Sequence, residues 1–556
     1  MPDRLPDHFR IALAQLNPVM GDIAGNLARA RAARKQAAGA EVILFSELFI
    51  VGYSPEDLVL KPALQEDARA AVEELARDTS DGGPAVLMGA PWVEEGKLYN
   101  AMLLLEGGRI AGKSFKVDLP NYGVFDEKRV FAPGPAPWPL TVRGVQLGVP
   151  ICEDIWKQEV TACLADSGAE ILCVPNGSPF EAGKEDVRLE LARSRVRESG
   201  LPLIYLNQLG GQDEVVYDGA SFVLNPDGAI AVALPGWEER VTITEWRPSA
   251  DGKWICAPGD TFLAEDRSSQ VYHAMMLALR DYVNKNRFPG VVLGLSGGID
   301  SALSAAVAVD ALGAERVRCV MLPSRYTSRD SLEDADACAQ ALGVQYETIE
   351  IERAVKAMGE SLSPAFAGTQ ADTTEENIQS RLRGVILMAI SNKFGPMVLT
   401  TGNKSEMSVG YATLYGDMCG GYNVLKDIYK TEVFRLSHWR NANSPAGALG
   451  PRGRVIPERI IEKPPTAELR ANQTDQDSLP PYDVLDGILE CLVERECSFE
   501  DTVARGYDPA TVKRVEHLLY VSEYKRRQAP PGVKISSRNF GRDRRYPITN
   551  AFRDAR

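Results

Sequence analysis

The residues 296–301, with the sequence SGGIDS, combine glycines, hydroxyls and a carboxylate in a spacing suited to phosphate chemistry. They follow the apolar run 291–295 and open the alanine-rich segment 302–311. A strand, a glycine-rich turn and a helix in this order leave N–H groups unpaired at the helix start, where they favour an anion together with the helix dipole. The loop is not a Walker A motif, because no Gly-Lys-Ser/Thr triplet follows. The predicted phosphate cradle consists of Ser296, Gly297, Gly298, Ile299, Asp300 and Ser301, of which Asp300 can hold a Mg²⁺ ion.

A second group of polar residues stands where predicted strands of the N-terminal half end. Glu47 follows the apolar run 42–45, Lys116 lies just past a hairpin at 107–108, and Cys152 comes directly after a strand. Because strand ends converge in α/β folds, we expect the three side chains at one site. A thiol beside a lysine and a helix N-terminus is expected to have a lowered pKa and to attack a carbonyl carbon. The carboxylate would serve as general base and the ammonium would stabilise the oxyanion.

Isolated residues of these types usually have structural roles. A lone cysteine is most often a small buried hydrophobic residue, and this interpretation is kept for Cys163 and Cys173. Glu47 stands between Leu-Phe pairs on both sides, an apolar environment that disfavours a carboxylate without a specific role. Lys113, three residues earlier, is the alternative to Lys116 as the site lysine.

The pattern of apolar runs predicts how these residues are positioned. Residues 1–245 are expected to form a layered α/β domain, and residues 246–268, rich in Pro, Gly, Asp and Ser, a linker. Residues 269–556 follow the strand–helix alternation of a doubly wound parallel sheet, whose ligands bind at the carboxyl ends of the strands. The strands predicted in the first domain cover 9–16, 41–45, 85–90, 99–105, 145–149, 171–174 and 203–206, with helices at 26–38 and 63–79.

Composition and charge narrow the class of protein. The chain has 556 residues, and 62 Lys and Arg against 76 Asp and Glu give a net charge of −14, which argues against broad affinity for nucleic acid or an anionic membrane. Its nine cysteines are scattered without CxxC pairs, as is typical of reduced thiols. The N-terminal residues lack the pattern of a signal peptide and no long apolar run occurs, so a cytoplasmic location is predicted.

Two family resemblances follow from these motifs. The loop 296–301 resembles the signature of the ATP pyrophosphatases, which cleave ATP between its α and β phosphates. SGG alone would suit a turn that binds nothing, but six contiguous positions match. The segments around Glu47 (FSELFIVGY) and Cys152 (GVPICEDIW), and the one that begins at Lys116 (KVDLPNYGVFDEKRVF), resemble the nitrilase, or carbon–nitrogen hydrolase, superfamily. That resemblance implies an αββα sandwich with a Glu-Lys-Cys triad acting on amides, and it favours Lys116 because the family lysine lies three residues before Leu-Pro-Asn-Tyr.

A chain that carries both parts resembles the glutamine-dependent NAD⁺ synthetase family. Segments 372–381, 401–418 and 530–549 are also similar to that family, except that Ser380 stands where Ala is expected. The resemblance implies a Rossmann-like synthetase domain, ATP and Mg²⁺, and amidation of nicotinic acid adenine dinucleotide through an adenylylated carboxylate. It further implies an ammonia tunnel from a glutaminase site and a homo-oligomer, with dimer and octamer both open.

The same resemblance implies roles for further residues. Glutamine is expected to contact Tyr122, Glu153, Ser178 and Arg188, with Phe125 and Asn176 nearby. Mg²⁺ is expected on Asp300 and Glu406, and ATP on the loop, Thr401 and Lys430. The dinucleotide is expected near Asn377, Arg381, Lys404 and Arg538. The basic tail 525–556, with ten Lys or Arg against two acids, is expected to close over the phosphate-rich substrate.

Three alternatives remain open at this point. The chain could be another amidotransferase of the pyrophosphatase class, acting on a different carboxylate or on a nucleobase. Its first domain could be an inactive docking module, with free ammonia supplying the second. The basic tail, taken alone, could also be solvated or bind RNA.

Overall fold

The structure, a computed structural model, describes residues 7–262 and 265–554. The chain divides into two compact units, one ending at Glu265 and the other beginning at Asp266. Each unit is described by itself. Within the described residues, no helix is both long enough and apolar enough to cross a membrane.

Two β-sheets form the centre of the first unit. A seven-stranded sheet has the order β15-β14-β1-β2-β3-β4-β5, and a six-stranded sheet has the order β13-β12-β9-β8-β7-β6. The seven strands are β1 (Phe9–Gln15), β2 (Val42–Leu44), β3 (Ala85–Glu94), β4 (Lys97–Glu106), β5 (Arg109–Phe115), β14 (Arg240–Pro248) and β15 (Trp254–Cys256). The six are β6 (Leu140–Val142), β7 (Val145–Gly148), β8 (Ile171–Asn176), β9 (Leu203–Asn207), β12 (Phe222–Leu224) and β13 (Ile230–Ala233), and a separate hairpin pairs β10 (Leu209–Gln212) with β11 (Val215–Asp218).

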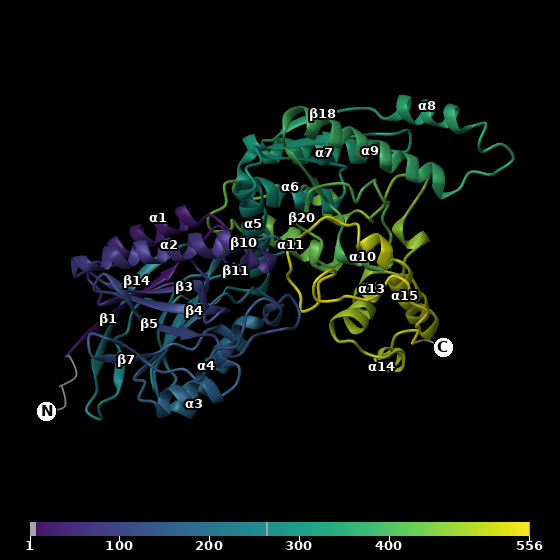
Figure 1. Cartoon of the computed structure of the whole chain (residues 1–556). Helices are drawn as coiled ribbons and strands as arrows, with labels where there is room; N and C mark the ends of the chain where they lie inside the picture. Colours follow the sequence, from purple (N-terminus) through teal and green to yellow (C-terminus); the bar gives the residue numbers. More distant parts are fainter. Residues whose placement is uncertain (1–6, 263–264, 555–556) are drawn as a thin grey trace. The chain divides into compact units, whose positions relative to one another are not determined.

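The two sheets pack face to face, and helices cover their outer faces. Apolar residues of both sheets, such as Leu44 and Leu147, share one buried core. Helices α1 (Ile23–Gln36) and α2 (Pro62–Asp78) pack on the first sheet, and α3 (Glu159–Asp166) and α4 (Lys184–Ser199) on the second (Figure 1). The αββα sandwich expected from the sequence is therefore confirmed.

The structure differs from the expected linker over 246–268. β14 pairs antiparallel with the first strand β1, and Trp246, Arg247 and Pro248 pair with β15. The buried indoles of Trp246 and Trp254 fill the core between the sheets. Two tryptophans in a stretch rich in Pro, Gly and Asp were the signal that this segment closes a sheet instead of connecting two domains.

The second unit is built on a five-stranded sheet with the order β18-β17-β16-β19-β20, and all its pairings are parallel. This arrangement confirms the predicted doubly wound sheet. Its strands are β16 (Val291–Gly294), β17 (Val317–Met321), β18 (Gln345–Thr348), β19 (Met397–Thr400) and β20 (Tyr422–Asn423). Its helices are α5 (Arg267–Lys285), α6 (Ile299–Leu312), α7 (Arg329–Leu342), α8 (Glu352–Leu362), α9 (Thr373–Phe394), α10 (Lys404–Val409), α11 (Lys430–Ala442) and α12 (Glu458–Glu462).

A helical cluster completes the second unit (Figure 1). Val409 of α10 packs with Tyr482, Leu485 and Leu519 in an apolar core separate from that of the sheet. The added helices are α13 (Tyr482–Leu489), which runs on into a π-helical turn at Glu490–Glu494, α14 (Phe499–Ala504), α15 (Pro509–Val521) and α16 (Glu523–Arg526). The chain then returns to the sheet, where Gly532 bridges to Asn423 on β20.

Candidate active sites

The predicted triad residues of the first unit converge in its buried interior. Glu47 follows β2, Lys116 follows β5 and Cys152 follows β7; the first two are fully buried and Cys152 is 4% exposed. Lys116 Nζ donates to Glu47 Oε1 at 2.6 Å. Glu47 is held in turn by Asn100 Nδ2 at 2.7 Å and by the backbone N–H of Gly177 at 2.9 Å. The carboxylate is therefore fixed in one orientation.

The nucleophile candidate lies on a sharp turn that a carboxylate holds in shape. Cys152 has a φ of 47°, an unusual value for a non-glycine residue, and it opens a 3₁₀ turn that ends at Ile155. Asp154 accepts from the N–H of Ile151 at 2.8 Å, and from the N–H groups of Val117 and Asp118 at 3.0 and 2.7 Å. This one carboxylate thus ties the turn bearing the thiol to the strand end bearing the lysine.

The environment of the thiol corrects one expectation from the sequence. Burial, reinforced by the negative charge of Glu47, raises the pKa of Cys152 well above its usual value, and the ammonium of Lys116 only partly offsets these effects. Burial alone would lower the pKa of Lys116, but the carboxylates of Glu127 and Glu47 raise it. The resting thiol is therefore protonated, and nucleophilic attack requires transfer of its proton to a base as the carbonyl arrives.

A second carboxylate, Glu127, belongs to the same cluster and was not singled out from the sequence. Its Oε1 accepts from Lys116 Nζ at 2.9 Å and from the hydroxyl of Tyr53 at 2.7 Å. Burial raises the pKa of Glu127. Glu127 lies inside the quoted segment that begins at Lys116, where a carboxylate beside Val130 and Phe131 was the available signal.

The residues predicted to contact glutamine form two groups. Tyr122 donates to Glu153 Oε2 at 2.9 Å, directly beside the thiol, and Phe125 packs edge-on against its ring. Arg188 lies deeper and is 3% exposed. Its guanidinium donates to both oxygens of Asp218 at 2.8 Å, to Ser178 Oγ and to two backbone carbonyls. All its donor directions are taken inside the protein, so in this structure Arg188 braces the loop that carries Ser178.

Asn176 takes part in the structure of the neighbouring strand ends. Its Nδ2 donates to the carbonyls of Val174 and Leu206. These two hydrogen bonds connect the ends of β8 and β9, so Asn176 stabilises the strands that lead to the site.

The loop 296–301 of the second unit joins β16 to α6 as predicted. Gly297 has a φ of 77°, and a Cβ there would lie 2.3 Å from the carbonyl oxygen of Ser331. Ser301 Oγ accepts from the N–H of Ser296 at 3.2 Å and donates to the carbonyl of Gly298 at 2.9 Å. The serines thus hold the loop open at the start of α6, where unpaired N–H groups collect.

Two carboxylates converge at the mouth of this loop. Lys430 Nζ lies 2.5 Å from Asp300 Oδ2 and 3.1 Å from Glu406 Oε1. Asn403 donates to Asp300 Oδ1 at 2.9 Å, and the Tyr482 hydroxyl donates to Glu406. Burial raises the pKa of Glu406 to about 7. The two side chains offer oxygen ligands to a hard divalent cation.

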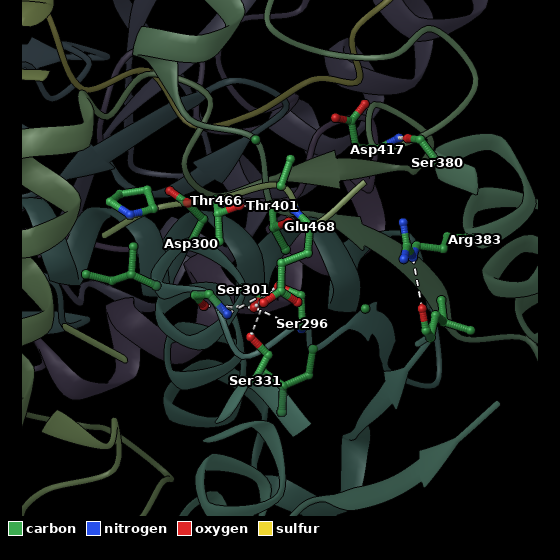
Figure 2. Close-up of a pocket in the computed structure, with 18 of the residues that line it drawn as sticks. Ser296, Asp300, Ser301, Ser331, Ser380, Arg383, Thr401, Asp417, Thr466 and Glu468 are labelled. Carbon is green, nitrogen blue, oxygen red and sulfur yellow. Dashed lines mark hydrogen bonds between the residues drawn. The ribbon is translucent and has the colours of Figure 1, made fainter. Parts of the chain in front are cut away.

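A pocket surrounds the loop and gathers residues from distant segments (Figure 2). It is lined by the loop, by Thr401 at the end of β19, and by Glu406 and Lys430. Six of its other polar lining residues, to which the sequence assigned no role, are Ser331, Arg383, Asp417, Thr466, Glu468 and Asp475. Glu468 Oε1 accepts from Ser331 Oγ at 2.8 Å, and Arg383 is fixed by its bond to the carbonyl of Leu322. Because these segments are far apart in the sequence, spacing could not have indicated that they share a cavity.

The four residues predicted to meet the dinucleotide lie outside this lining. Asn377 accepts from Thr413 Oγ1, and Arg381, exposed on α9, donates to the carbonyl of Leu414. Lys404 is fully buried, and its ammonium pairs with the carboxylates of Asp427 and Glu494, neither of which lines the pocket. Arg538 pairs with Glu496 at 2.9 Å. The placement of Lys404 differs from the expectation, because no donor of its ammonium is left for a substrate.

Comparisons with known proteins agree with this division into two units. Residues 10–254 match the family model of carbon-nitrogen hydrolases, and residues 271–529 match that of NAD synthase. A glutamine-dependent NAD(+) synthetase of Rhodobacter capsulatus is 55% identical over 99% of this chain and 100% of its own length. One from Xanthomonas campestris is 49% identical over 98% of both chains.

A solved structure gives the same result in three dimensions. The glutamine-dependent NAD+ synthetase from Acinetobacter baumannii, determined in complex with adenosine diphosphate, has a TM-score of 0.78 and is 42% identical, covering 98% of this chain and 99% of its own. The similarity therefore spans both units and not only one of them. The chain belongs to the glutamine-dependent NAD(+) synthetase family.

Proposed function

We propose that this protein makes NAD⁺ by ATP-dependent amidation of nicotinic acid adenine dinucleotide, with glutamine as the nitrogen donor. Residues 1–245 would supply the glutaminase and residues 269–556 the synthetase, although the sheet of the first unit extends to Cys256. The single observation that carries the proposal is the presence, in one chain, of a buried Cys-Lys-Glu cluster and a phosphate loop facing two carboxylates.

In the glutaminase half, the buried cluster provides each group that amide hydrolysis needs. Cys152 Sγ would attack the side-chain carbonyl of glutamine while Glu47 takes its proton, giving a tetrahedral oxyanion that Lys116 stabilises. Collapse of the intermediate would release ammonia, which takes up the proton from Glu47, and leave a thioester. Water, deprotonated by Glu47, would then release glutamate. The charged amino group of the substrate would meet Glu153, whose carboxylate accepts from the Tyr122 hydroxyl.

In the synthetase half, the carboxylate of the dinucleotide would attack the α phosphate of ATP, and pyrophosphate would leave into the cradle 296–301. Asp300 and Glu406 would hold Mg²⁺ together with phosphate oxygens and water, which is the mixed ligand set that Mg²⁺ prefers. Bound Mg²⁺ would neutralise the charge that develops on the leaving pyrophosphate. Lys430 would contribute a second positive charge, and Thr401 would contact the nucleotide. Ammonia would then displace AMP from the acyl adenylate.

The proposal is tested by following NAD⁺, AMP and pyrophosphate with either glutamine or ammonium chloride as donor. We expect NAD⁺ with both donors, one AMP for each NAD⁺. Cys152→Ala should abolish synthesis from glutamine and leave synthesis from ammonia within about twofold. Loss of both activities in this variant would contradict the two-site assignment. Glutaminase activity without NAD⁺ from either donor would show that the acceptor is another carboxylate.

We also infer that the protein is a homo-oligomer. Helix α9 has 22 residues, of which only Gln379, Ser380, Gly384 and Ile390 are buried, and the side chain of Val385 is 62% exposed. Arg381, a predicted dinucleotide contact, is exposed on the same helix. A second copy packed on α9 would cover the exposed side chain of Val385. It would then lie beside Arg381, where the dinucleotide is expected. Val385→Glu should lower the mass measured by light scattering, whereas Val187→Glu on α4 should leave it unchanged.

A cytoplasmic location is part of the proposal. All nine cysteines are free, and six of them are buried. Unpaired thiols in this number are typical of proteins from a reducing compartment.

A further inference from the structure

The part of the tail that follows α16, residues 531–544 and here called the tail segment, packs against the sheet and α10. The carbonyl of Pro531 accepts from the N–H of Asn423 at 3.0 Å, so the tail segment begins alongside β20. Val533 is fully buried and Ile535 is 3% exposed. These contacts make the tail segment an integral part of the second unit.

One buried ammonium connects the tail segment to α10. Lys404 Nζ donates to Ser536 Oγ at 2.7 Å and to the carbonyl of Arg538 at 2.9 Å. The same nitrogen pairs with Asp427 Oδ1 at 2.7 Å and with Glu494. The side chain of Lys404 is fully buried, so these partners replace all of its water.

The two carboxylates complete the connection from the other side. Asp427 Oδ2 accepts from the N–H groups of Ile535 and Ser536 at 2.7 and 2.6 Å. Glu494 Oε2 accepts from the N–H of Arg538 at 3.0 Å. Each carboxylate therefore needs both the ammonium and the tail backbone, and removal of either leaves a buried charge without part of its compensation.

The residues next to Lys404 on α10 shape the mouth of the phosphate loop. Asn403, the preceding residue, donates to Asp300 and also caps α10 by accepting from the N–H of Glu406 at 3.0 Å. Ser405, the following residue, accepts from the N–H of Lys430 at 2.8 Å. Asn403, Lys404 and Ser405, at the N-terminus of α10, thus hold Asp300, the tail segment and the start of α11 respectively. A displacement of Lys404 would therefore also displace the groups that hold the two carboxylates at the mouth of the loop.

We propose that Lys404 and Asp427 are positioning residues that couple the C-terminal tail segment to the ATP site. Docking of the tail segment on Lys404 holds α10 so that Asn403 and Glu406 meet Asp300 in the geometry that binds ATP with its metal ion. The tail segment acts through α10 and does not touch the nucleotide. This inference rests on the proposed function of the second unit.

The test uses the full chain and measures ATP binding by calorimetry, with and without Mg²⁺ and with no dinucleotide present. The variants are Lys404→Met, Asp427→Asn and the two combined; the control is Lys356→Met, a lysine that is 74% exposed on α8. We expect Lys404→Met to weaken ATP binding in the presence of Mg²⁺ at least tenfold, and to weaken binding without Mg²⁺ much less. The double variant should lose less than the product of the two single losses, because it removes both members of one pair.

The thermal unfolding profile reports whether the second unit of each variant is folded, and glutamine hydrolysis reports whether the first unit is. ATP binding within twofold of the unaltered chain in folded Lys404→Met would overturn the proposal, as would equal losses with and without Mg²⁺. If Lys404→Met does not fold, Asp427→Asn decides by the same two criteria. Failure of the proposed function would appear differently, as ATP binding by the unaltered chain without NAD⁺ formation from either nitrogen donor.

Discussion

At the scale of single residues, the sequence indicated which side chains lie together better than it indicated their charge states. Glu47, Lys116 and Cys152 come together as expected. The thiol, however, was expected to have a lowered pKa because only the positive charge of Lys116 and a helix N-terminus were considered. Burial and Glu47 act in the opposite direction, and neither is visible in a local motif. Arg188 shows the same limit, since its partner Asp218 lies 30 residues away.

The raised pKa of Cys152 predicts how the thiol reacts with a small electrophile in the absence of glutamine. As long as the pH is below the pKa, each increase of one pH unit raises the fraction of reactive thiolate about tenfold. We therefore expect the rate of alkylation by iodoacetamide to increase throughout the range from pH 6 to 9 with no plateau. The measurement is the loss of glutaminase activity against time at each pH. A plateau near neutral pH would mean that Lys116 dominates and that the thiolate is already formed.

Gly297 gives a second prediction at this scale. Gly297→Ala combines a positive φ with a Cβ 2.3 Å from the Ser331 carbonyl, so the phosphate loop must move. We expect synthesis of NAD⁺ from ammonia to fall at least 100-fold, with glutamine hydrolysis retained. Gly343→Ala is the matched control, because its φ of 70° is similar but the nearest atom lies 4.0 Å away. If both variants lose activity equally, backbone strain and not the shape of the loop is responsible.

At the scale of elements, apolar runs predicted four of the seven strands in one sheet of the first unit, β1 to β4, and three of the six in the other, β7 to β9. A strand buried on both faces has a continuous apolar sequence, which is the signal that these runs supplied. They missed β14, a half-exposed strand inside a polar stretch, in which Thr244 and Trp246 are buried while Ile243 and Glu245 are exposed. The positive charge of the tail suggested a phosphate-rich ligand, which stays a prediction. Part of that charge is paired inside the fold, since Lys534 pairs with Asp543 within the segment. Charge counts do not tell which partners a fold supplies.

Asp154 links two elements and gives a prediction that includes pH. Burial raises its pKa to about 7, from a usual value of 3.8. The folded state therefore binds more protons between these two values, so the free energy of unfolding falls as the pH rises through that window. Asp154→Asn cannot accept all three N–H bonds and should reduce glutaminase activity at least tenfold. The amide of this variant does not titrate. The difference in free energy of unfolding between the unaltered chain and the variant should therefore decrease by about 3 kcal/mol between pH 5 and pH 8.

The measurement is the denaturant midpoint of the first unit at the two pH values, with NAD⁺ synthesis from ammonia as a control for the second. An advantage that stays constant between pH 5 and pH 8 would show that Asp154 has the same pKa in the folded and unfolded chains.

At the scale of the whole molecule, the chain consists of two units, and each proposed site lies within one of them. Asp300→Asn should therefore stop ATP cleavage, because one of the two carboxylates that face each other at the loop is lost. Hydrolysis of glutamine should continue at a measurable rate, since every group of the Cys152 cluster lies in the first unit. The check is parallel assay of AMP and glutamate. Complete loss of glutamate formation would mean that the glutaminase works only when the synthetase site is intact.

The pairing of β1 with β14 also determines when the first unit can fold during synthesis. β1 lies between β2 and β14, and its residue Phe9 pairs with Trp246. A ribosome that has released only the first 200 residues has therefore made β1 without one of its two neighbours, and an open strand edge is prone to pair with other chains. β1 gains its second neighbour only after residue 248, the last of β14, has emerged from the ribosome. Protection of nascent chains by a chaperone should consequently persist until about 280 residues have been translated, allowing about 30 for the ribosomal exit tunnel.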